Sequence, residues 1–330
     1  MSKKDFLHIN DLSQDQIYQI FDKAEWIKSK FKNRENYRPF DGMTLAMIFA
    51  KPSARTRVSF ETGYYRLGGH ALYLGPNDIG IGKRESVSDI AKVVSRFNDI
   101  IMARLFNHQD IIDLAKFSDV PVVNGLTDFN HPCQIMADLF TIYEKLGRYE
   151  DFKIAYIGDG NNITHSWLKL SCQLKFKLSI ATPEDYEPDS GIISESISIR
   201  TSEVELHKNP FEAVRDADVI YTDVWASMGQ KQESETRRRL FARYQVNQEL
   251  MAATGKKDTL FMHCLPAERG VEVTDNVCDD PVFQIYSSAL WPSIKVKKIN
   301  ENTYEYQLLK KGNLIQLGDS SKTFQEGYLN

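Results

Sequence analysis

Short apolar runs alternate with helix-like segments along most of this chain, and this alternation limits the possible folds more than any other feature. Apolar runs bounded by polar residues are typical of buried strands, and the segments between them show helical periodicity. The strand-like runs span residues 44–50, 71–74, 100–103, 121–124, 153–157, 178–182, 219–222 and 259–263. Helical patterns lie between them, for example at 86–97, 109–117 and 134–146. The order predicts an α/β protein with parallel sheets and helices on both faces.

The length of the chain favours two such units. Its 330 residues exceed one ordinary core, because domains commonly hold roughly 150 residues. The helix predicted at 134–146 would join the units, with a boundary near 147–152. We therefore expect two doubly wound parallel-sheet domains, 1–147 and 148–280, followed by an atypical tail over 281–330.

Polar clusters follow the predicted strands, at the point where each strand ends. They lie at 53–57, at Arg104, and at 131–134, 159–162, 223–229 and 263–266. In open parallel sheets, ligands bind beyond the carboxyl ends of the strands. The clusters are therefore expected to converge on a binding site.

The segment 53–57 reads Ser-Ala-Arg-Thr-Arg and lies between the first strand and a helix predicted at 58–67. Free backbone N–H groups at the start of a helix bind anions, and the guanidinium forks of Arg55 and Arg57 match phosphate geometry. The alternative is a surface pair of arginines at a helix start. The context favours a phosphate site, although not a Walker loop, because no Gly-rich run ending in Gly-Lys-Ser/Thr is present.

Arg104 and the segment His131-Pro132-Cys133-Gln134 are further candidates. A lone arginine at a strand end can also be a solvated cap. His131 and Gln134 lie three residues apart on one helical face, so both could donate to one carbonyl oxygen or amide. Their spacing with Cys133 fits no standard zinc pattern, so we predict no metal.

Gly158-Asp159-Gly160-Asn161-Asn162 follows a strand and precedes a helix, as a dinucleotide-binding turn would. The match to that motif is incomplete, because Ile163 takes the place of the third glycine and no acid ends the next strand. No nicotinamide cofactor is expected. Two adjacent amides suit the head group of an α-amino acid, while a plain helix cap is the competing interpretation.

The segments 223–229 and 263–266 complete the set of candidates. Asp223 offers a carboxylate for an ammonium group, with Ser227 beside it and Gly229 giving the flexibility of a closing loop. Cys264 could be a nucleophile, could face a substrate amine together with the Leu265 carbonyl, or could be a buried, inert thiol.

Composition excludes several classes of protein. A net charge of −4 gives no general attraction to nucleic acid or to anionic membranes. No apolar run approaches the ~18 residues of a membrane span. The four cysteines are scattered without a CxxC pair, which indicates reduced thiols. The first residues read neither as a signal peptide nor as a good transit peptide, so the cytoplasm is the default expectation.

Taken together and in order, these motifs resemble the aspartate/ornithine carbamoyltransferase superfamily, and most closely its ornithine carbamoyltransferase branch. Many stretches of the sequence are similar to plant-type members of that branch. The resemblance covers about residues 4–277. It rests on the segments 53–57, 103–104, 131–134, 159–162, 223–229 and 263–267. Within the superfamily, Ser227-Met228-Gly229 and His263-Cys264-Leu265-Pro266 point to ornithine rather than aspartate.

The resemblance implies transfer of a carbamoyl group from carbamoyl phosphate to the δ-amine of L-ornithine, without a cofactor, a metal or a covalent intermediate, by a homotrimer. It implies that the 1–147 domain binds carbamoyl phosphate and that the 148–280 domain binds ornithine. Carbamoyl phosphate would be held by Ser53, Ala54, Arg55, Thr56, Arg104, His131 and Gln134. Ornithine would be held by Asn162, Asp223, Ser227, Met228, Cys264 and Leu265. The residues acting in catalysis would be Arg104, His131, Gln134 and Cys264.

The sequence departs from the family pattern in two places. Gly80 occupies a position where family members often carry Gln or His on a loop that reaches a neighbouring subunit. Beyond about residue 277 the family's Glu-Asn-Arg segment and long C-terminal helix are missing, and Arg269 is the last arginine in the chain. Residues 295–299 and 303–308 alternate as strands do, and 310–317 follows a turn. A frameshift and a genuine diverged tail are both compatible with this pattern.

The missing arginine leaves alternative functions open. One is a homologue that binds carbamoyl phosphate or a partner chain without turnover. Another keeps the enzyme class but uses putrescine or an N-acylated ornithine as acceptor; Asp223 and the 227–229 segment speak against it, because a diamine lacks the α-carboxyl group.

Overall fold

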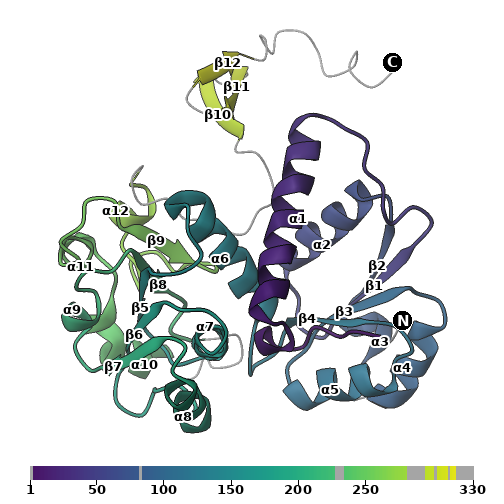
Figure 1. The fold of residues 1–330 in the computed structure, drawn as a ribbon, viewed down its shortest axis with the longest axis horizontal. Coiled ribbons are helices and arrows are strands. Elements are labelled where there is room, and N and C mark those ends of the chain that lie inside the picture. Colours follow the sequence, from purple (N-terminus) through teal and green to yellow (C-terminus); the bar gives the residue numbers. More distant parts are fainter. Residues whose placement is uncertain are drawn as a thin grey trace.

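The computed structural model describes residues 3–81, 84–226 and 234–280, together with the backbone of three strands between 294 and 316. Up to residue 280 the chain forms two parallel sheets, and helices pack around each of them (Figure 1). The predicted α/β class is therefore confirmed.

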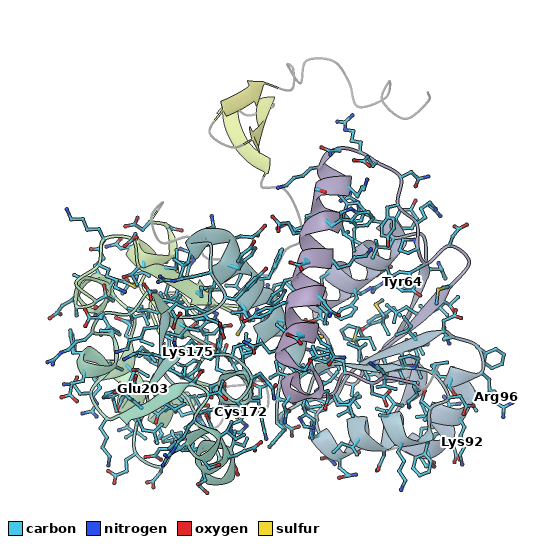
Figure 2. All side chains as sticks on the ribbon, in the orientation of Figure 1. Tyr64, Lys92, Arg96, Cys172, Lys175 and Glu203 are labelled. Carbon is cyan, nitrogen blue, oxygen red and sulfur yellow. The ribbon has the colours of Figure 1, made fainter. Side chains whose placement is uncertain are left out.

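The first sheet has the strand order β2-β1-β3-β4. Its strands are β1 (Thr44–Phe49), β2 (His70–Leu74), β3 (Ile100–Arg104) and β4 (Val122–Leu126). The helices of this half are η1 (Ile9–Asp11), α1 (Gln14–Lys32), α2 (Ala54–Arg66), α3 (Pro76–Ile79), α4 (Val87–Ser95), α5 (His108–Phe117) and α6 (Pro132–Leu146). Tyr64 of α2 stacks on Phe40 at 4.9 Å, whereas Lys92 of α4 and Arg96, which follows that helix, lie on the outer surface (Figure 2).

The second sheet has the strand order β7-β6-β5-β8-β9. Its strands are β5 (Lys153–Ile157), β6 (Lys177–Ala181), β7 (Glu203–His207), β8 (Val219–Thr222) and β9 (Leu260–His263). The helices around it are α7 (Asn162–Ser171), α8 (Ser190–Ile199), α9 (Pro210–Ala213), α10 (Ser234–Phe241), η3 (Ala242–Tyr244), α11 (Gln248–Ala252) and α12 (Asp275–Cys278).

Among the nine strands of the two parallel sheets, β7 is the one that the sequence did not predict. It reads Glu-Val-Glu-Leu-His and pairs only with β6, at the edge of the sheet. Alternating charges on an edge strand discourage pairing with other chains, and they also remove the continuous apolar run by which the buried strands were recognised.

The strand order fixes where ligands can bind. Each sheet has a central strand whose two neighbours are reached by connections running in opposite directions, β1 in the first sheet and β5 in the second. At such switch points the loops leave on opposite sides of the sheet and open a crevice. The expected crevices lie between β1 and β3 and between β5 and β8.

Helices α1 and α6 connect the two halves. Ile17 and Phe21 of α1 share one hydrophobic core with Leu139 of α6 and with Trp167 and Tyr221 of the second half. All five side chains are almost completely buried. In Figure 1 helix α1 lies between the two sheets, and its buried face packs on the core of the second half.

The residues before η1 attach to the first sheet. Phe6 forms a parallel bridge with Val123 of β4, in which the Phe6 N–H donates to the Val122 carbonyl at 2.8 Å. The Asp5 carboxylate accepts from the Val122 N–H, also at 2.8 Å. The edge of β4 is therefore covered by the start of the chain.

The strand-like alternation in the tail corresponds to β10 (Ile294–Asn300), β11 (Thr303–Lys310) and β12 (Asn313–Gln316), which form an antiparallel sheet in that order. In Figure 1 this sheet lies apart from the two parallel sheets. Among the described helices, none has both the length and the apolar character needed to cross a membrane.

Candidate active site

A cleft of about 1630 Å³ runs between the two halves and is lined by residues from both. Its wall contains the predicted residues Ser53, Ala54, Arg55, Thr56, Arg104, His131, Gln134, Asn162, Asp223, Cys264 and Leu265. These come from the ends of β1, β3, β4, β5, β8 and β9. Ser227 and Met228, the two remaining candidates, lie outside the described residues.

The start of α2 has the geometry of an anion site. Ser53 is the N-cap, and its Oγ accepts from the Thr56 N–H at 3.4 Å. The Ser53 hydroxyl also donates to Thr56 Oγ1 at 3.1 Å. Arg104 Nη1 donates to the same Thr56 oxygen at 3.3 Å, across the switch point between β1 and β3. A helix N-terminus, two hydroxyls and a guanidinium therefore meet at one place, as an anion requires.

The two arginines of the 53–57 segment have different surroundings. Arg55 lines the cleft, whereas Arg57 turns back along α2, where its Nε donates to Glu61 at 2.9 Å and its guanidinium lies over the Tyr73 ring. Of the two arginines, the geometry therefore favours Arg55 over Arg57 as a phosphate ligand. Residues 55 and 57 lie on different faces of a helix, so only one can point into a site at its N-terminus.

Arg104 and His131 present buried polar atoms to the cleft. Arg104 Nε and His131 Nδ1 are both buried and have no hydrogen-bond partner in the described part of the chain. Burial lowers the pKa of Arg104 to about 10, with Arg55 adding repulsion. Burial, together with the charges of Arg104 and Lys51, lowers the pKa of His131 to about 3. His131 is therefore a neutral imidazole at physiological pH, beside a charged guanidinium.

Unpartnered buried polar atoms are costly, about 1–3 kcal/mol each, and are rare in folded proteins. Both atoms belong to residues that line the cleft. Gln134 follows on α6, and its amide donates to Asp138 at 3.0 Å, while Tyr221 donates to the other Asp138 oxygen at 2.7 Å. Burial raises the pKa of Asp138 to about 7.

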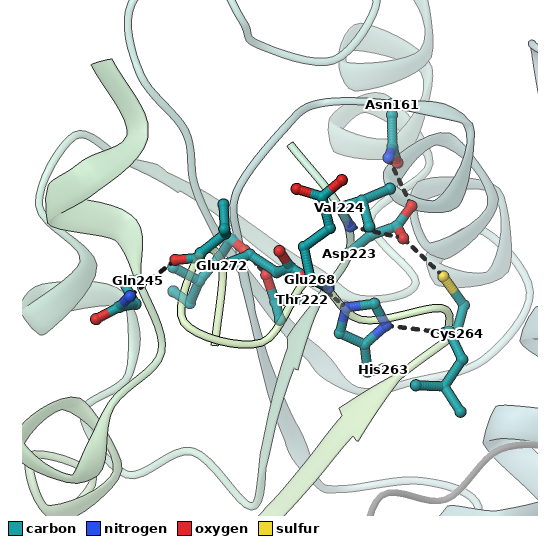
Figure 3. A network of polar contacts seen from close by, with 12 residues as sticks. Asn161, Thr222, Asp223, Val224, Gln245, His263, Cys264, Glu268 and Glu272 are labelled. Atoms are coloured by element: carbon teal, nitrogen blue, oxygen red, sulfur yellow. Dashed lines mark hydrogen bonds and ion pairs between the residues drawn. The ribbon is translucent and has the colours of Figure 1, made fainter. Parts of the chain in front are cut away.

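A second polar group lies at the switch point between β5 and β8. The Asp223 carboxylate accepts from Asn161 Nδ2 at 2.8 Å, from its neighbour's backbone N–H (Val224) at 2.8 Å and from the Cys264 thiol at 2.9 Å (Figure 3). Asn161 caps α7, so its neighbour Asn162 points elsewhere and donates to the Thr127 carbonyl at 2.7 Å. The capping interpretation thus holds for Asn161, and Asn162 is the amide that lines the cleft.

The environment of Cys264 decides between its possible roles. Burial, strengthened by the Asp223 carboxylate, raises the pKa of its thiol well above the usual value. The thiol therefore stays protonated and donates to Asp223. A thiolate nucleophile would be repelled by this carboxylate, so the geometry disfavours covalent catalysis by Cys264.

Behind Cys264, His263 and Glu272 form a completely buried pair, with Nε2 and Oε1 3.1 Å apart (Figure 3). His263 Nδ1 accepts from the Leu265 N–H at 2.8 Å. A neutral imidazole has one N–H, so Nε2 carries it and donates to Glu272. The pair fixes the backbone of Leu265, which adopts a left-handed φ of 58°.

Three donor atoms of Asp223, His263 and Cys264 lie within 4.8 Å of one another, close enough to hold a metal ion. In this arrangement both ring nitrogens of His263 are already in hydrogen bonds, and Cys264 carries its proton. These groups fit a hydrogen-bond network better than a metal site, because a metal needs a free imidazole nitrogen and a thiolate.

Sequence reasoning missed three residues at this site. Lys51 lines the cleft, and burial, with repulsion from Arg104, lowers its pKa. Arg237 of α10 donates to Asp159 at 2.9 Å and to the Trp225 carbonyl at 2.8 Å, closing the cleft wall. Glu272 supports His263 from nine residues further on. Only Lys51 had a local signal, as a cation between a buried strand and the anion site.

Gly160 illustrates how tightly the 158–162 loop is packed. A Cβ there would lie 2.3 Å from the backbone nitrogen of Pro188 and 2.4 Å from the backbone carbon of Glu187. Gly160→Ala is therefore expected to lower the free energy of unfolding by about 1–3 kcal/mol. At Gly63, inside α2, a Cβ meets nothing within 4 Å, so Gly63→Ala is expected to raise it by about 0.5–1 kcal/mol. Chemical denaturation of both variants measures the contrast, and equal effects would contradict it.

Comparison with known proteins agrees with this geometry. Residues 4–144 match the family model for the aspartate/ornithine carbamoyltransferase carbamoyl-P binding domain, and residues 150–291 match the model for the Asp/Orn binding domain. The chain belongs to the aspartate/ornithine carbamoyltransferase family. The second match reaches residue 291, beyond the 277 at which the motif resemblance ended.

Relatives within this family are similar over most of the chain. A protein from Pisum sativum named ornithine carbamoyltransferase, chloroplastic, is 56% identical over 87% of this chain and 76% of its own length. The ornithine carbamoyltransferase of Syntrophus aciditrophicus is 50% identical over 87% of this chain and 95% of its own. The solved structure of ornithine carbamoyltransferase from Pyrococcus furiosus has a TM-score of 0.83 at 47% identity, over 87% of this chain and 92% of that one.

Proposed function

We propose that this protein transfers the carbamoyl group of carbamoyl phosphate to the δ-amine of L-ornithine, giving L-citrulline and phosphate, a step of arginine biosynthesis. The observation that carries the proposal is the meeting of two complementary groups in one cleft. An anion site with a buried guanidinium faces an amide and carboxylate site suited to an amino acid. The names of the relatives support the same reaction.

Carbamoyl phosphate would bind at the start of α2. The backbone N–H groups after Ser53, the two hydroxyls and Arg55 would hold the phosphate and neutralise the charge of the leaving group. Arg104, His131 and Gln134 would donate to the carbamoyl oxygen, which gains negative charge on attack. Arg104 Nε is free for this purpose, and His131 can use the nitrogen that carries its proton.

Ornithine would bind between α7 and the loop after β8. The Asp223 carboxylate suits the α-ammonium group, and Asn162 suits the α-carboxylate, with Ser227 and Met228 completing this end. The Cys264 sulfur and the Leu265 carbonyl would orient the uncharged δ-amine. The amine nitrogen then forms a bond to the carbonyl carbon, the bond from that carbon to the phosphate oxygen breaks, and the amine proton leaves with the phosphate. Orientation supplies much of the rate increase.

Citrulline formation by the purified chain tests the proposal, with L-ornithine fixed and carbamoyl phosphate varied over a wide range. Arg269, the last arginine of the chain, is tied to Asp275 and Asp279 on the surface. This chain has no counterpart of the arginine that the family pattern carries in its Glu-Asn-Arg segment. We therefore expect turnover with a KM for carbamoyl phosphate about tenfold to a hundredfold higher than that of a family member with this arginine, because a charged hydrogen bond is worth about 1.5–3 kcal/mol.

The negative outcome has an equally clear meaning. Absence of citrulline at every carbamoyl phosphate concentration, from folded protein that still binds a phosphate analogue, would overturn the proposal in favour of a binding-only homologue. Replacing L-ornithine by putrescine in the same assay tests the acceptor. We expect putrescine to react at least tenfold more slowly, because it has no α-groups for Asp223 and Asn162 to hold.

The assembly, the boundaries and the compartment complete the proposal. Tyr65 of α2 and Leu72 of β2 are exposed apolar side chains in the first half, and exposed apolar side chains favour association between copies. We expect a homotrimer, with light scattering giving three times the 37.9 kDa chain mass.

The 1–147 and 148–280 ranges are the proposed carbamoyl phosphate and ornithine domains, and the cytoplasm is the proposed compartment.

A further inference from the structure

Two histidines, a threonine and an asparagine form a closed ring of hydrogen bonds beside the cleft. Asn130 Nδ2 lies 2.9 Å from His8 Nδ1, and His8 Nε2 lies 3.2 Å from His108 Nε2. His108 Nδ1 lies 2.9 Å from Thr127 Oγ1, and the Thr127 hydroxyl donates to Asn130 Oδ1 at 3.2 Å. Thr127 and Asn130 are fully buried. None of the four residues belongs to the proposed substrate ligands.

The chemistry of the ring fixes every proton in it. An amide nitrogen can only donate, so His8 Nδ1 accepts and its proton resides on Nε2. His108 Nε2 must then accept from His8, which places the His108 proton on Nδ1, directed at Thr127. The other bonds of Asn130 fix its amide orientation, since Asn124 Nδ2 donates to its oxygen at 2.6 Å and its own nitrogen donates to the Leu7 carbonyl at 3.1 Å. All four bonds therefore run in one direction around the ring.

The ring holds the loop of residues 127–131, and this loop contacts α7 at three points. Asn162 Nδ2 donates to the Thr127 carbonyl at 2.7 Å, and His165 Nδ1 lies 2.9 Å from the Phe129 carbonyl. The His131 N–H donates to Ser166 Oγ at 2.8 Å. The ring belongs to the first half of the chain and α7 to the second, so these bonds couple the two walls of the cleft.

The geometry points to His8, His108, Thr127 and Asn130 as positioning residues, which set the place of Asn162 for the α-carboxylate of ornithine through the Thr127 carbonyl. This inference rests on the proposed function, because it assumes that Asn162 is a substrate ligand. His8 acts here although it lies more than 100 residues before the loop that it fixes.

The ring requires both imidazoles to be neutral. A second proton on His108 would sit on Nε2 and face the His8 Nε2–H across 3.2 Å. A second proton on His8 would sit on Nδ1 and face the Asn130 amide N–H across 2.9 Å. The charged groups facing His8 are Asp11, Lys169 and Glu195, and Asp11 also faces His108. Burial lowers the pKa of His8, and burial together with His8 lowers the pKa of His108 to about 4.

These pKa shifts give a stability prediction with a definite sign. The unfolded chain binds protons at these histidines below about pH 6.5, whereas the folded chain does so only at lower pH. Their contribution to stability is therefore complete above about pH 6.5 and is lost as the pH falls toward about 4. In His108→Gln, which does not titrate, the unfolding midpoint in urea is expected to fall less steeply over this range. The exposed His70 serves as control, and His70→Gln should match the parent protein.

Thr127→Val tests the positioning role directly. It removes the ring hydroxyl, keeps the side-chain volume and keeps the backbone carbonyl that holds Asn162. We expect the KM for L-ornithine to rise about tenfold, the equivalent of one hydrogen bond, with the KM for carbamoyl phosphate changed less than twofold. Thr127→Ser retains the hydroxyl and should restore the ornithine KM to within twofold of the parent value.

The outcomes separate this inference from a merely structural role and from the proposed function. A folded Thr127→Val protein with an unchanged ornithine KM, or with both KM values raised equally, would overturn the positioning role. The proton order is tested without any turnover by ¹H–¹⁵N spectra of the histidine rings, assigned with His8→Gln and His108→Gln. We expect the Nε2–H form for His8 and the Nδ1–H form for His108, and the opposite forms would exclude the ring. If the parent makes no citrulline, the proposed function fails while the spectra still decide the ring.

Discussion

Replacing Arg104 by methionine is expected to lower kcat/KM for carbamoyl phosphate by about two to three orders of magnitude, the usual cost of removing a donor to a developing oxyanion. Methionine fills a similar volume but offers no donor, either to Thr56 or to the carbamoyl oxygen. The buried Arg104 Nε has no partner in the described part of the chain, so the substrate is the group expected to complete it. Steady-state citrulline formation with varied carbamoyl phosphate measures the effect.

Arg57→Met is the matched control. Arg57 stands on the same helix as the anion site, but it pairs with Glu61 and lies over Tyr73, away from the cleft. Its kcat/KM should remain within about twofold of the parent value. A folded Arg104→Met protein that keeps more than a tenth of the activity would refute the assignment of Arg104 to the carbamoyl oxygen.

Asp223→Asn is expected to have the largest effect on the ornithine side, lowering kcat/KM for L-ornithine by about two to three orders of magnitude. Removing one partner of a buried, hydrogen-bonded charge pair costs about 2–5 kcal/mol, and each 1.4 kcal/mol is tenfold. Cys264 donates to one carboxylate oxygen and Asn161 to the other, so the amide nitrogen of asparagine would face one of these donors in either orientation. Ornithine saturation curves at fixed carbamoyl phosphate provide the measurement.

Two comparisons make the Asp223→Asn result specific. The KM for carbamoyl phosphate should change less than threefold, because Asp223 lies at the other sheet. Asp151→Asn, which removes an exposed carboxylate paired with Lys175 on the surface, should leave both KM values unchanged. If Asp223→Asn raised both KM values to the same extent, its role would lie in the shape of the cleft and not in binding the ammonium group.

The sequence predicted those parts of the fold that depend on local patterns. Buried strands such as β1 and β8 are recognisable as apolar runs. The helix predicted at 58–67 was placed too late, because α2 begins at Ala54 and the polar segment 53–57 hides its first turn. Strand β7 was not predicted, because charged residues alternate along this edge strand and interrupt the apolar run. The direction of the Arg57 side chain could not be predicted from the motif, because it depends on contacts with Glu61 and Tyr73.

The site was predictable as a set of strand ends but not as a network. Which side chains meet is decided by the strand order, and that order places β3 beside β1 and β8 beside β5. Arg104 thereby reaches Thr56, and Asp223 reaches Asn161. Glu272 left no signal at all, because a lone acid in a loop looks the same whether it is solvated or completely buried beside His263.

The attachment of the first residues to β4 also constrains the order of events during synthesis. Phe6 and His8 are synthesised more than a hundred residues before Val123 and Asn130, to which they bind. At about 5–20 residues per second, the beginning of the chain waits roughly 5 to 25 s for its place in the fold. Until then α1 exposes the apolar face that it later buries, including Ile17 and Phe21. A chaperone that binds apolar helices would therefore have the longest time to bind α1 while the first half of the chain is being synthesised.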